Sequence, residues 1–157
     1  MTSLISIRAT YASDPDRTFA DARSFERLRD VMRGLAAYDG LPCTGQLVEG
    51  KTYCTDIWFW GLFPVRNHTI HVVKVDVAKR HLITSERHAG IRTWTHSLTV
   101  ESADGETVWL DQIWIDAGFQ TALVARYAQY VYVRKHRRQG ALTATSMIKR
   151  QIAANLY

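Results

Sequence analysis

Residues 93–100 read Thr-Trp-Thr-His-Ser-Leu-Thr-Val, a run in which hydroxyl side chains alternate with larger ones. This period of two predicts a half-buried β-strand whose inner face carries Trp94, His96, Leu98 and Val100. An ionisable side chain on such a face must be paired or neutralised, because burial removes its contact with water. The run therefore predicts a sheet that covers a core with a polar group inside it.

An Asp-Gly pair at residues 104–105 predicts a two-residue hairpin after this strand. The hairpin places His96 and Asp111 as diagonal neighbours, close enough for their side chains to meet. The pair could be a general base with its orienting carboxylate, or a buried hydrogen bond that only satisfies both groups. The structural role is favoured, because the pattern places no nucleophile beside the pair. The hairpin also continues the inner face along the next strand: Trp109, Asp111, Ile113 and Ile115.

The same alternation can be followed backwards through the earlier strands. A loop at residues 88–90 is expected to set Glu86 opposite Arg92, which favours an ion pair between them. Each step assumes regular pairing, since one bulge reverses the faces of a strand. Through turns at 77–78 and 61–64, alternation assigns these further residues to the inner face: Val75, Val73, His71, Thr69, Asn67, Trp60, Trp58, Asp56 and Cys54. The other face collects cations and is expected to meet solvent: Lys51, Arg66, Lys74, Lys79 and Arg87.

The predicted inner face is both aromatic and ionisable. A core packed only for stability rarely contains so many ionisable groups. An apolar surface with a few convergent polar groups is typical of a ligand site. We therefore expect a cavity whose ligand contacts come from the inner face and from the last helix: Asp56, Trp58, Trp60, His71, Glu86, Arg92, Trp94, His96, Leu98, Asp111, Ile113, Tyr127 and Tyr130.

The regions on either side of these strands predict helices. Residues 4–11 alternate like a strand, and Asp14-Pro15 then predicts a helix start, followed by one or two amphipathic helices. Residues 41–116 are expected to form about six antiparallel strands. Residues 119–138 contain neither Gly nor Pro and predict a long amphipathic helix. The tail, 142–157, shows a weak helical pattern.

This order of elements resembles the START-like superfamily, also labelled SRPBCC or polyketide cyclase/dehydrase-like. The residue-level likeness covers about residues 91–138: the run at 93–100, then Leu-Asp-Gln-Ile-Trp-Ile-Asp-Ala-Gly at 110–118, then a helix ending Tyr-Val-Arg-Lys-His-Arg at 132–137. The resemblance implies an α+β helix-grip fold over a single domain, 1–157. In that fold a curved antiparallel sheet of about seven strands wraps a long C-terminal helix, with short helices between strands 1 and 2. It also implies a cavity for an apolar or aromatic ligand, and it supplies no catalytic motif.

Composition narrows the remaining function classes. The chain has 157 residues, of which 46% are hydrophobic and 11% aromatic, enough for one core and too aromatic for disorder. Two cysteines, Cys43 and Cys54, are expected to be reduced thiols of a cytoplasmic protein. We identify no signal peptide, and no apolar run reaches the roughly 20 residues of a membrane helix. The net charge of +5 comes mostly from one run: Arg134, Lys135, Arg137 and Arg138.

Three functions follow as hypotheses. The favoured one is a carrier or sensor that binds a small hydrophobic, aromatic or lipid-like molecule, with no cofactor. The first alternative is a cyclase or dehydratase in which His96 and Asp111 move protons. The second is nucleic-acid binding through Arg134–Arg138, against which a solvated basic helix end is favoured.

Two further sites have competing explanations. Asp56, His71 and Glu86 could hold a metal, but no motif spacing supports one, and ion pairing is favoured. The apolar hairpin at residues 58–65 could form a cavity lip or a homodimer contact, or could simply be covered by the N-terminal helices.

Overall fold

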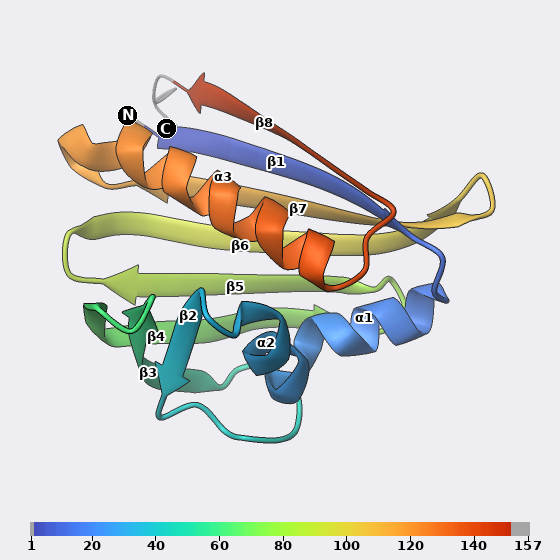
Figure 1. Ribbon diagram of the computed structural model, residues 1–157, viewed down its shortest axis with the longest axis horizontal. Coiled ribbons are helices and arrows are strands. Elements are labelled where there is room, and N and C mark those ends of the chain that lie inside the picture. The colour runs from blue at the N-terminus through green and yellow to red at the C-terminus, as the bar shows by residue number, and fades with distance from the viewer. Residues whose placement is uncertain (1, 152–157) are drawn as a thin grey trace.

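A single antiparallel sheet dominates the computed structural model, which describes residues 2–151. Its strand order is β2-β3-β4-β5-β6-β7-β1-β8, and the helices lie together on one of its faces (Figure 1). The elements are β1 (Thr2–Tyr11), α1 (Pro15–Arg23), α2 (Phe25–Met32), β2 (Ala36–Asp39), β3 (Thr52–Phe59), β4 (Phe63–Asp76), β5 (His81–His88), β6 (Ile91–Ala103), β7 (Glu106–Asp116), η1 (Gly118–Gln120), α3 (Thr121–Arg138) and β8 (Thr143–Gln151).

The first strand and the start of the helices follow the sequence pattern. In β1, Ile5 and Ile7 are fully buried, as their alternation predicts. The side chain of Asp14 caps α1 by accepting hydrogen bonds from the backbone N–H groups of Asp16 and Arg17, at 2.9 and 3.1 Å. The expected order of a strand followed by two amphipathic helices is confirmed.

The C-terminal tail differs from its prediction. Residues 143–151 form β8, an outer strand that pairs antiparallel with β1, rather than a helix. Strand β1 has β7 on one side only, so its other edge offers unpaired backbone groups that a Thr-rich segment with β-branched residues can pair with. The rest of the tail, 152–157, lies outside the described residues.

The number of strands also differs slightly from the expectation of about seven. Residues 41–116 contain five strands instead of about six, because 40–51 form a loop. The short strand β2 lies earlier, at 36–39, and with β8 the sheet has eight strands. The helix-grip architecture, a sheet packed against a long C-terminal helix, is confirmed.

The strand faces are predicted correctly where pairing is regular and wrongly where it is not. Asp104 and Gly105 form the expected two-residue turn, both with positive φ. Strand β4 contains two irregularities, one at Val73 and one at Arg66–Asn67, where Asn67 has a φ of 54°. Each adds one residue to β4 and reverses its faces.

These bulges decide which side chains of β4 point inward. The first one turns His71, Thr69 and Asn67 outward, and His68, Ile70 and Val72 take their places. The second irregularity reverses the alternation again. As a result, Ile57 and Phe59 of β3 face inward, and the residues next to them in the strand face outward. The outward residues of β3 include three that were expected inside: Cys54, Asp56 and Trp58.

Candidate ligand-binding site

A cavity of about 470 Å³ lies between the sheet, α2 and α3. Its volume is within the range of roughly 300–1,000 Å³ that is usual for small-molecule sites. Most of its lining is apolar and comes from α2, from β3 to β6 and from α3: Leu28, Met32, Ile57, Phe59, Val65, Ile70, Leu82, Leu98, Val124 and Val131.

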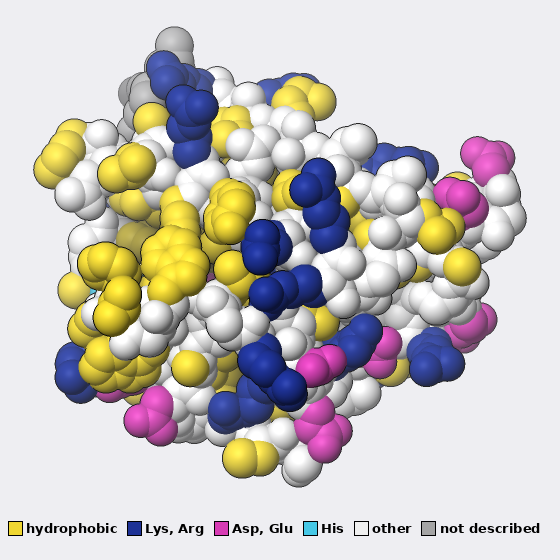
Figure 2. Space-filling model, in the orientation of Figure 1, with side chains coloured by type: hydrophobic (Ala, Val, Ile, Leu, Met, Phe, Trp, Pro, Cys, Tyr) yellow, Lys and Arg dark blue, Asp and Glu magenta, His cyan; other side chains and the backbone are white. Residues whose placement is uncertain are grey.

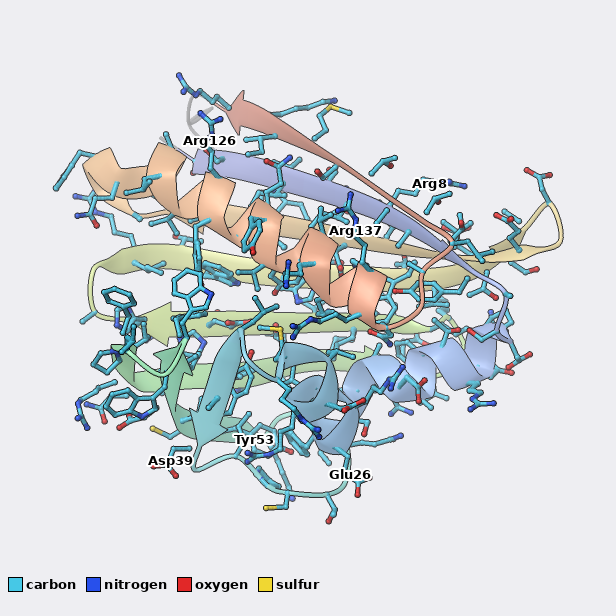
Figure 3. All side chains as sticks on the ribbon, in the orientation of Figure 1. Arg8, Glu26, Asp39, Tyr53, Arg126 and Arg137 are labelled. Carbon is cyan, nitrogen blue, oxygen red and sulfur yellow. The ribbon has the colours of Figure 1, made fainter. Side chains whose placement is uncertain are left out.

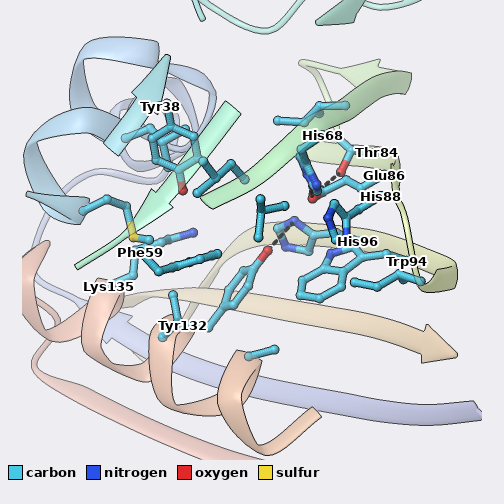
Figure 4. A pocket seen from close by; sticks show the side chains of 18 of the residues that line it. Tyr38, Phe59, His68, Thr84, Glu86, His88, Trp94, His96, Tyr132 and Lys135 are labelled. Atoms are coloured by element: carbon cyan, nitrogen blue, oxygen red, sulfur yellow. Dashed lines mark hydrogen bonds and ion pairs between the residues drawn. The ribbon is translucent and has the colours of Figure 1, made fainter. Parts of the chain in front are cut away.

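One wall of the cavity carries a polar cluster on β4 and β5 (Figure 4). The imidazole Nε2 of His68 lies 2.8 Å from Oε2 of Glu86, and the hydroxyl of Thr84 lies 3.5 Å from Oε1 of the same carboxylate. His88 is a neighbour of His68, and burial together with that imidazole lowers the pKa of His88. The predicted ion pair between Glu86 and Arg92 is therefore wrong, because Glu86 pairs with His68 instead.

Asp111 is the centre of a second polar cluster, which lies behind the cavity wall. The carboxylate is fully buried and takes three hydrogen bonds. Oδ1 accepts from His96 Nε2 at 2.7 Å and from Trp109 Nε1 at 2.8 Å, and Oδ2 accepts from His136 Nε2 at 2.6 Å. The predicted contact between His96 and Asp111 is confirmed.

The charges and burial around Asp111 determine the protonation states of Asp111 and His136. Burial alone would raise the pKa of Asp111, but Lys135, His96 and His136 outweigh it and hold that pKa well below its usual range. Asp111 is therefore a carboxylate that accepts from both imidazoles. Burial lowers the pKa of His136, so this imidazole is neutral and donates through Nε2.

Two groups on α3 connect the Asp111 cluster to the cavity. The hydroxyl of Tyr132 lies 3.5 Å from His96 Nδ1, and burial raises the pKa of Tyr132 well above its usual value. The ammonium of Lys135 lies 4.7 Å from the ring centroid of Trp109 and 5.0 Å from that of Tyr132. Figure 4 shows Tyr132 and Lys135 entering the cavity from the helix.

Six of the predicted site residues line the cavity: Trp60, Glu86, Trp94, His96, Leu98 and Tyr127. Asp111 and Ile113 are fully buried in the layer behind it. Asp56, Trp58 and His71 lie on the outer face for the reason given above, so their assignment to the cavity is wrong. Arg92 and Tyr130 are exposed and lie outside the lining.

The sequence pattern missed several polar residues of the cavity, among them Tyr38, His68, His88, Tyr132 and Lys135. Regular alternation places His68 on the outer face, and only the bulge at Val73 turns it inward. Lys135 could have been found from helical spacing, because Tyr127, Val131 and Lys135 follow one another at intervals of four residues on one face of a helix. Because Lys135 belongs to a basic run, the sequence pattern favours a solvated position for it.

That basic run does not form one continuous surface. Lys135 lines the cavity, and Arg138 donates hydrogen bonds to the backbone carbonyls of Val31 and Arg33, which ties α3 to the end of α2. Arg134 and Arg137 are exposed on α3, and Figure 3 shows Arg137 on this helix. Figure 2 shows Lys and Arg side chains spread as a band across this face rather than as a single cluster.

The hairpin between β3 and β4 forms an apolar rim beside the cavity. Trp60, Leu62 and Phe63 are 45%, 73% and 61% exposed, so the N-terminal helices do not cover this tip. The ring of Trp60 packs against Tyr127 at 5.5 Å between centroids. Figure 2 shows the hydrophobic side chains gathered on this side of the molecule.

Within residues 2–151, no group of three or more His, Cys, Asp or Glu side chains could hold a metal ion. The possible metal set of Asp56, His71 and Glu86 is divided between the two faces of the sheet. In the same part of the chain, no helix is long and apolar enough to cross a membrane.

Comparison with known proteins identifies the fold. No family model and no curated protein matches the sequence. Protein Ms6760 from Mycobacterium smegmatis has a similar structure, with a TM-score of 0.68 and 12% identity over 86% of each chain. Protein CV1439 from Chromobacterium violaceum matches with a TM-score of 0.65 and 11% identity over 85% of this chain and 94% of its own. CalU16 from Micromonospora echinospora matches with a TM-score of 0.61 and 13% identity over 87% of this chain and 76% of its own. At 11–13% identity, these matches show that the chain shares the fold of these proteins.

Proposed function

We propose that this chain, as a helix-grip domain, binds a small apolar and aromatic molecule between its sheet and α3, and acts as a carrier or sensor. The observation that carries the proposal is the cavity of about 470 Å³ with its largely apolar lining. Burial of apolar surface contributes roughly 25 cal/mol per Å², so such a lining favours an apolar ligand. The polar groups on the cavity wall would orient it.

Two unpaired donors favour a ligand that also has an oxygen or nitrogen acceptor. The indole N–H of Trp94 and the hydroxyl of Tyr127 are buried, and neither meets a described partner at hydrogen-bond geometry, although the indole lies near the Tyr132 hydroxyl. Both residues line the cavity. A buried donor without a partner costs about 1–3 kcal/mol, which a ligand acceptor would recover.

The test is binding of N-phenyl-1-naphthylamine, a neutral fluorescent probe, to wild type, Trp94→Ala and Trp58→Ala. We expect the loss of Trp94 to weaken binding about tenfold or more, because about 1.4 kcal/mol of contact energy is a factor of ten. Trp58 is the matched control, since it lies on the outer face beneath Arg66. Failure of the wild type to bind the probe, or equal losses in both variants, would overturn the proposal. If the wild type binds the probe and Trp94→Ala weakens that binding, native mass spectrometry of protein from its own host would search for the natural ligand.

A cyclase- or dehydratase-type enzyme is the second candidate, and one observation favours it. His96 lines the cavity while its Nε2 is held by the Asp111 carboxylate, an arrangement that fixes the tautomer and leaves Nδ1 as a base. Exchange of the α-hydrogens of 2-tetralone in D₂O would report such proton transfer. An enzyme should lose this exchange in His96→Gln while still binding the fluorescent probe. A carrier should show no exchange above solvent in either protein.

A further inference from the structure

Lys135 is a half-buried cation whose ammonium has no ion-pair or hydrogen-bond partner among the described residues. Its side chain lines the cavity and its ammonium lies between two aromatic faces, those of Trp109 and Tyr132. In the described part of the chain it forms neither an ion pair nor a hydrogen bond. Buried charges in proteins are usually paired, so this amine calls for an explanation.

We propose that Lys135 is a nucleophilic amine that captures the carbonyl carbon of an apolar aldehyde or ketone in the cavity as a Schiff base. This inference rests on the proposed function, because the carbonyl compound would occupy the same cavity. It names both the chemical class of the ligand and the atom that holds it.

The charges around Lys135 leave the amine available. Asp111 on β7 and Glu86 on β5 both attract the ammonium, but each carboxylate already accepts hydrogen bonds from other side chains. His96 on β6 and His136 on α3 lie in the same region. Burial outweighs the two carboxylates and lowers the pKa of Lys135. A desolvated lysine of this kind is the form that reacts with carbonyl compounds.

The reaction needs no other reagent. The neutral amine nitrogen adds to the carbonyl carbon, the π electron pair of the C=O bond moves to oxygen, and one proton leaves the nitrogen for that oxygen. The resulting hydroxyl then leaves as water together with the second amine proton, and a C=N bond forms. An apolar cavity favours this loss of water, while binding of the ligand body supplies proximity.

The experiment is reductive trapping with 2-naphthaldehyde and cyanoborohydride, followed by peptide mapping. The chain contains four other lysines, all exposed, which act as internal controls: Lys51, Lys74, Lys79 and Lys149. At pH 7 and limiting aldehyde we expect Lys135 to be labelled about tenfold or more above each of them, because an ordinary exposed lysine is protonated at this pH and does not add to a carbonyl group. Near pH 10.5 this preference should disappear.

The controls separate this inference from the proposed function. Lys135→Arg keeps a cation at this position but cannot form a Schiff base, so it should lose the selective label, while the wild type binds N-phenyl-1-naphthylamine. An excess of that probe should block labelling of Lys135 alone. Equal labelling of all five lysines in a protein that binds the probe would overturn the inference and leave the proposed function standing. Absence of probe binding would overturn both.

Discussion

Tyr11 and His136 lie 125 residues apart in the sequence, yet the Tyr11 hydroxyl is 2.6 Å from His136 Nδ1. The hydroxyl donates this hydrogen bond, because burial, with the neighbouring Asp111 charge, raises the pKa of Tyr11, and the other ring nitrogen of His136 donates to Asp111. A continuous chain of hydrogen bonds therefore runs from β1 through α3 and β7 to His96 on the cavity wall.

Substitution Tyr11→Phe should lower the free energy of unfolding by about 1–3 kcal/mol, because it leaves the buried Nδ1 of His136 without a donor. Urea denaturation followed by circular dichroism measures this loss. Tyr130→Phe is the control, since Tyr130 is half exposed on the same helix as His136. Equal stabilities of the two variants would show that the buried hydrogen bond contributes nothing.

Substitution Asp111→Asn should cost more, about 3–5 kcal/mol, because one amide cannot replace a carboxylate that takes bonds from two imidazoles and an indole. The same denaturation experiment measures it. Asp39→Asn, at an exposed position at the end of β2, should stay within about 0.5 kcal/mol of wild type. A loss below about 1 kcal/mol for Asp111→Asn would contradict the central role of this carboxylate.

The stability of the protein should fall with pH below about 6.5, the ordinary pKa of histidine. Burial lowers the pKa of His136 in the folded state, so the unfolded chain takes up this proton first as pH falls. The contribution of His136 is complete above pH 6.5 and is lost as pH falls towards its folded pKa. His88, whose pKa is also lowered, acts in the same window.

Unfolding free energies measured from pH 7.5 to 5 should therefore decline in wild type and decline less steeply in His136→Gln. A glutamine can still donate to Asp111 but does not titrate. Identical slopes in the two proteins would contradict the assignment of His136 as a neutral buried imidazole.

Two glycines with similar backbone angles provide a matched pair for testing a close contact. Gly40 has a φ of +94°, and an added Cβ there would lie 3.0 Å from the carbonyl oxygen of Cys54. Gly45 has a φ of +96° and open space around it. Both alanine variants should be strained, by about 1–3 kcal/mol. Gly40→Ala should lose about 1 kcal/mol more because it also crowds β3, and thermal unfolding would measure the difference.

The sequence was informative where strands pair without interruption. The alternation from Thr93 to Val100 and the Asp104-Gly105 turn were sufficient to bring His96 and Asp111 together. The observed register between β5 and β6 differs from the expected one by two residues: the loop after His88 is one residue shorter, and an irregularity between Glu86 and His88 adds one residue to β6. A shift by two keeps each side chain on its face, so Glu86 was still placed inside.

The sequence was least informative where an extra residue enters a strand. The bulge at Val73 reverses the direction of the side chains from Val72 back to Asn67 without changing the composition of the strand. The place of Lys135 in the cavity is not visible in the sequence for a different reason. A run of four cations indicates a solvated helix end, and only the packing of α3 against the sheet shows that one of them enters the cavity.

The same bulge means that the shape of the cavity and the identity of its lining can change separately. Deletion of Val73 would let Val72 and Lys74 pair with Thr84 and Ile83 as a regular ladder, with the inward residues of β4 unchanged. A bulge bends its strand, so the deletion would straighten this part of the sheet. One inserted or deleted residue could therefore widen or narrow the chamber in related chains, without substitution of any side chain that contacts the bound molecule.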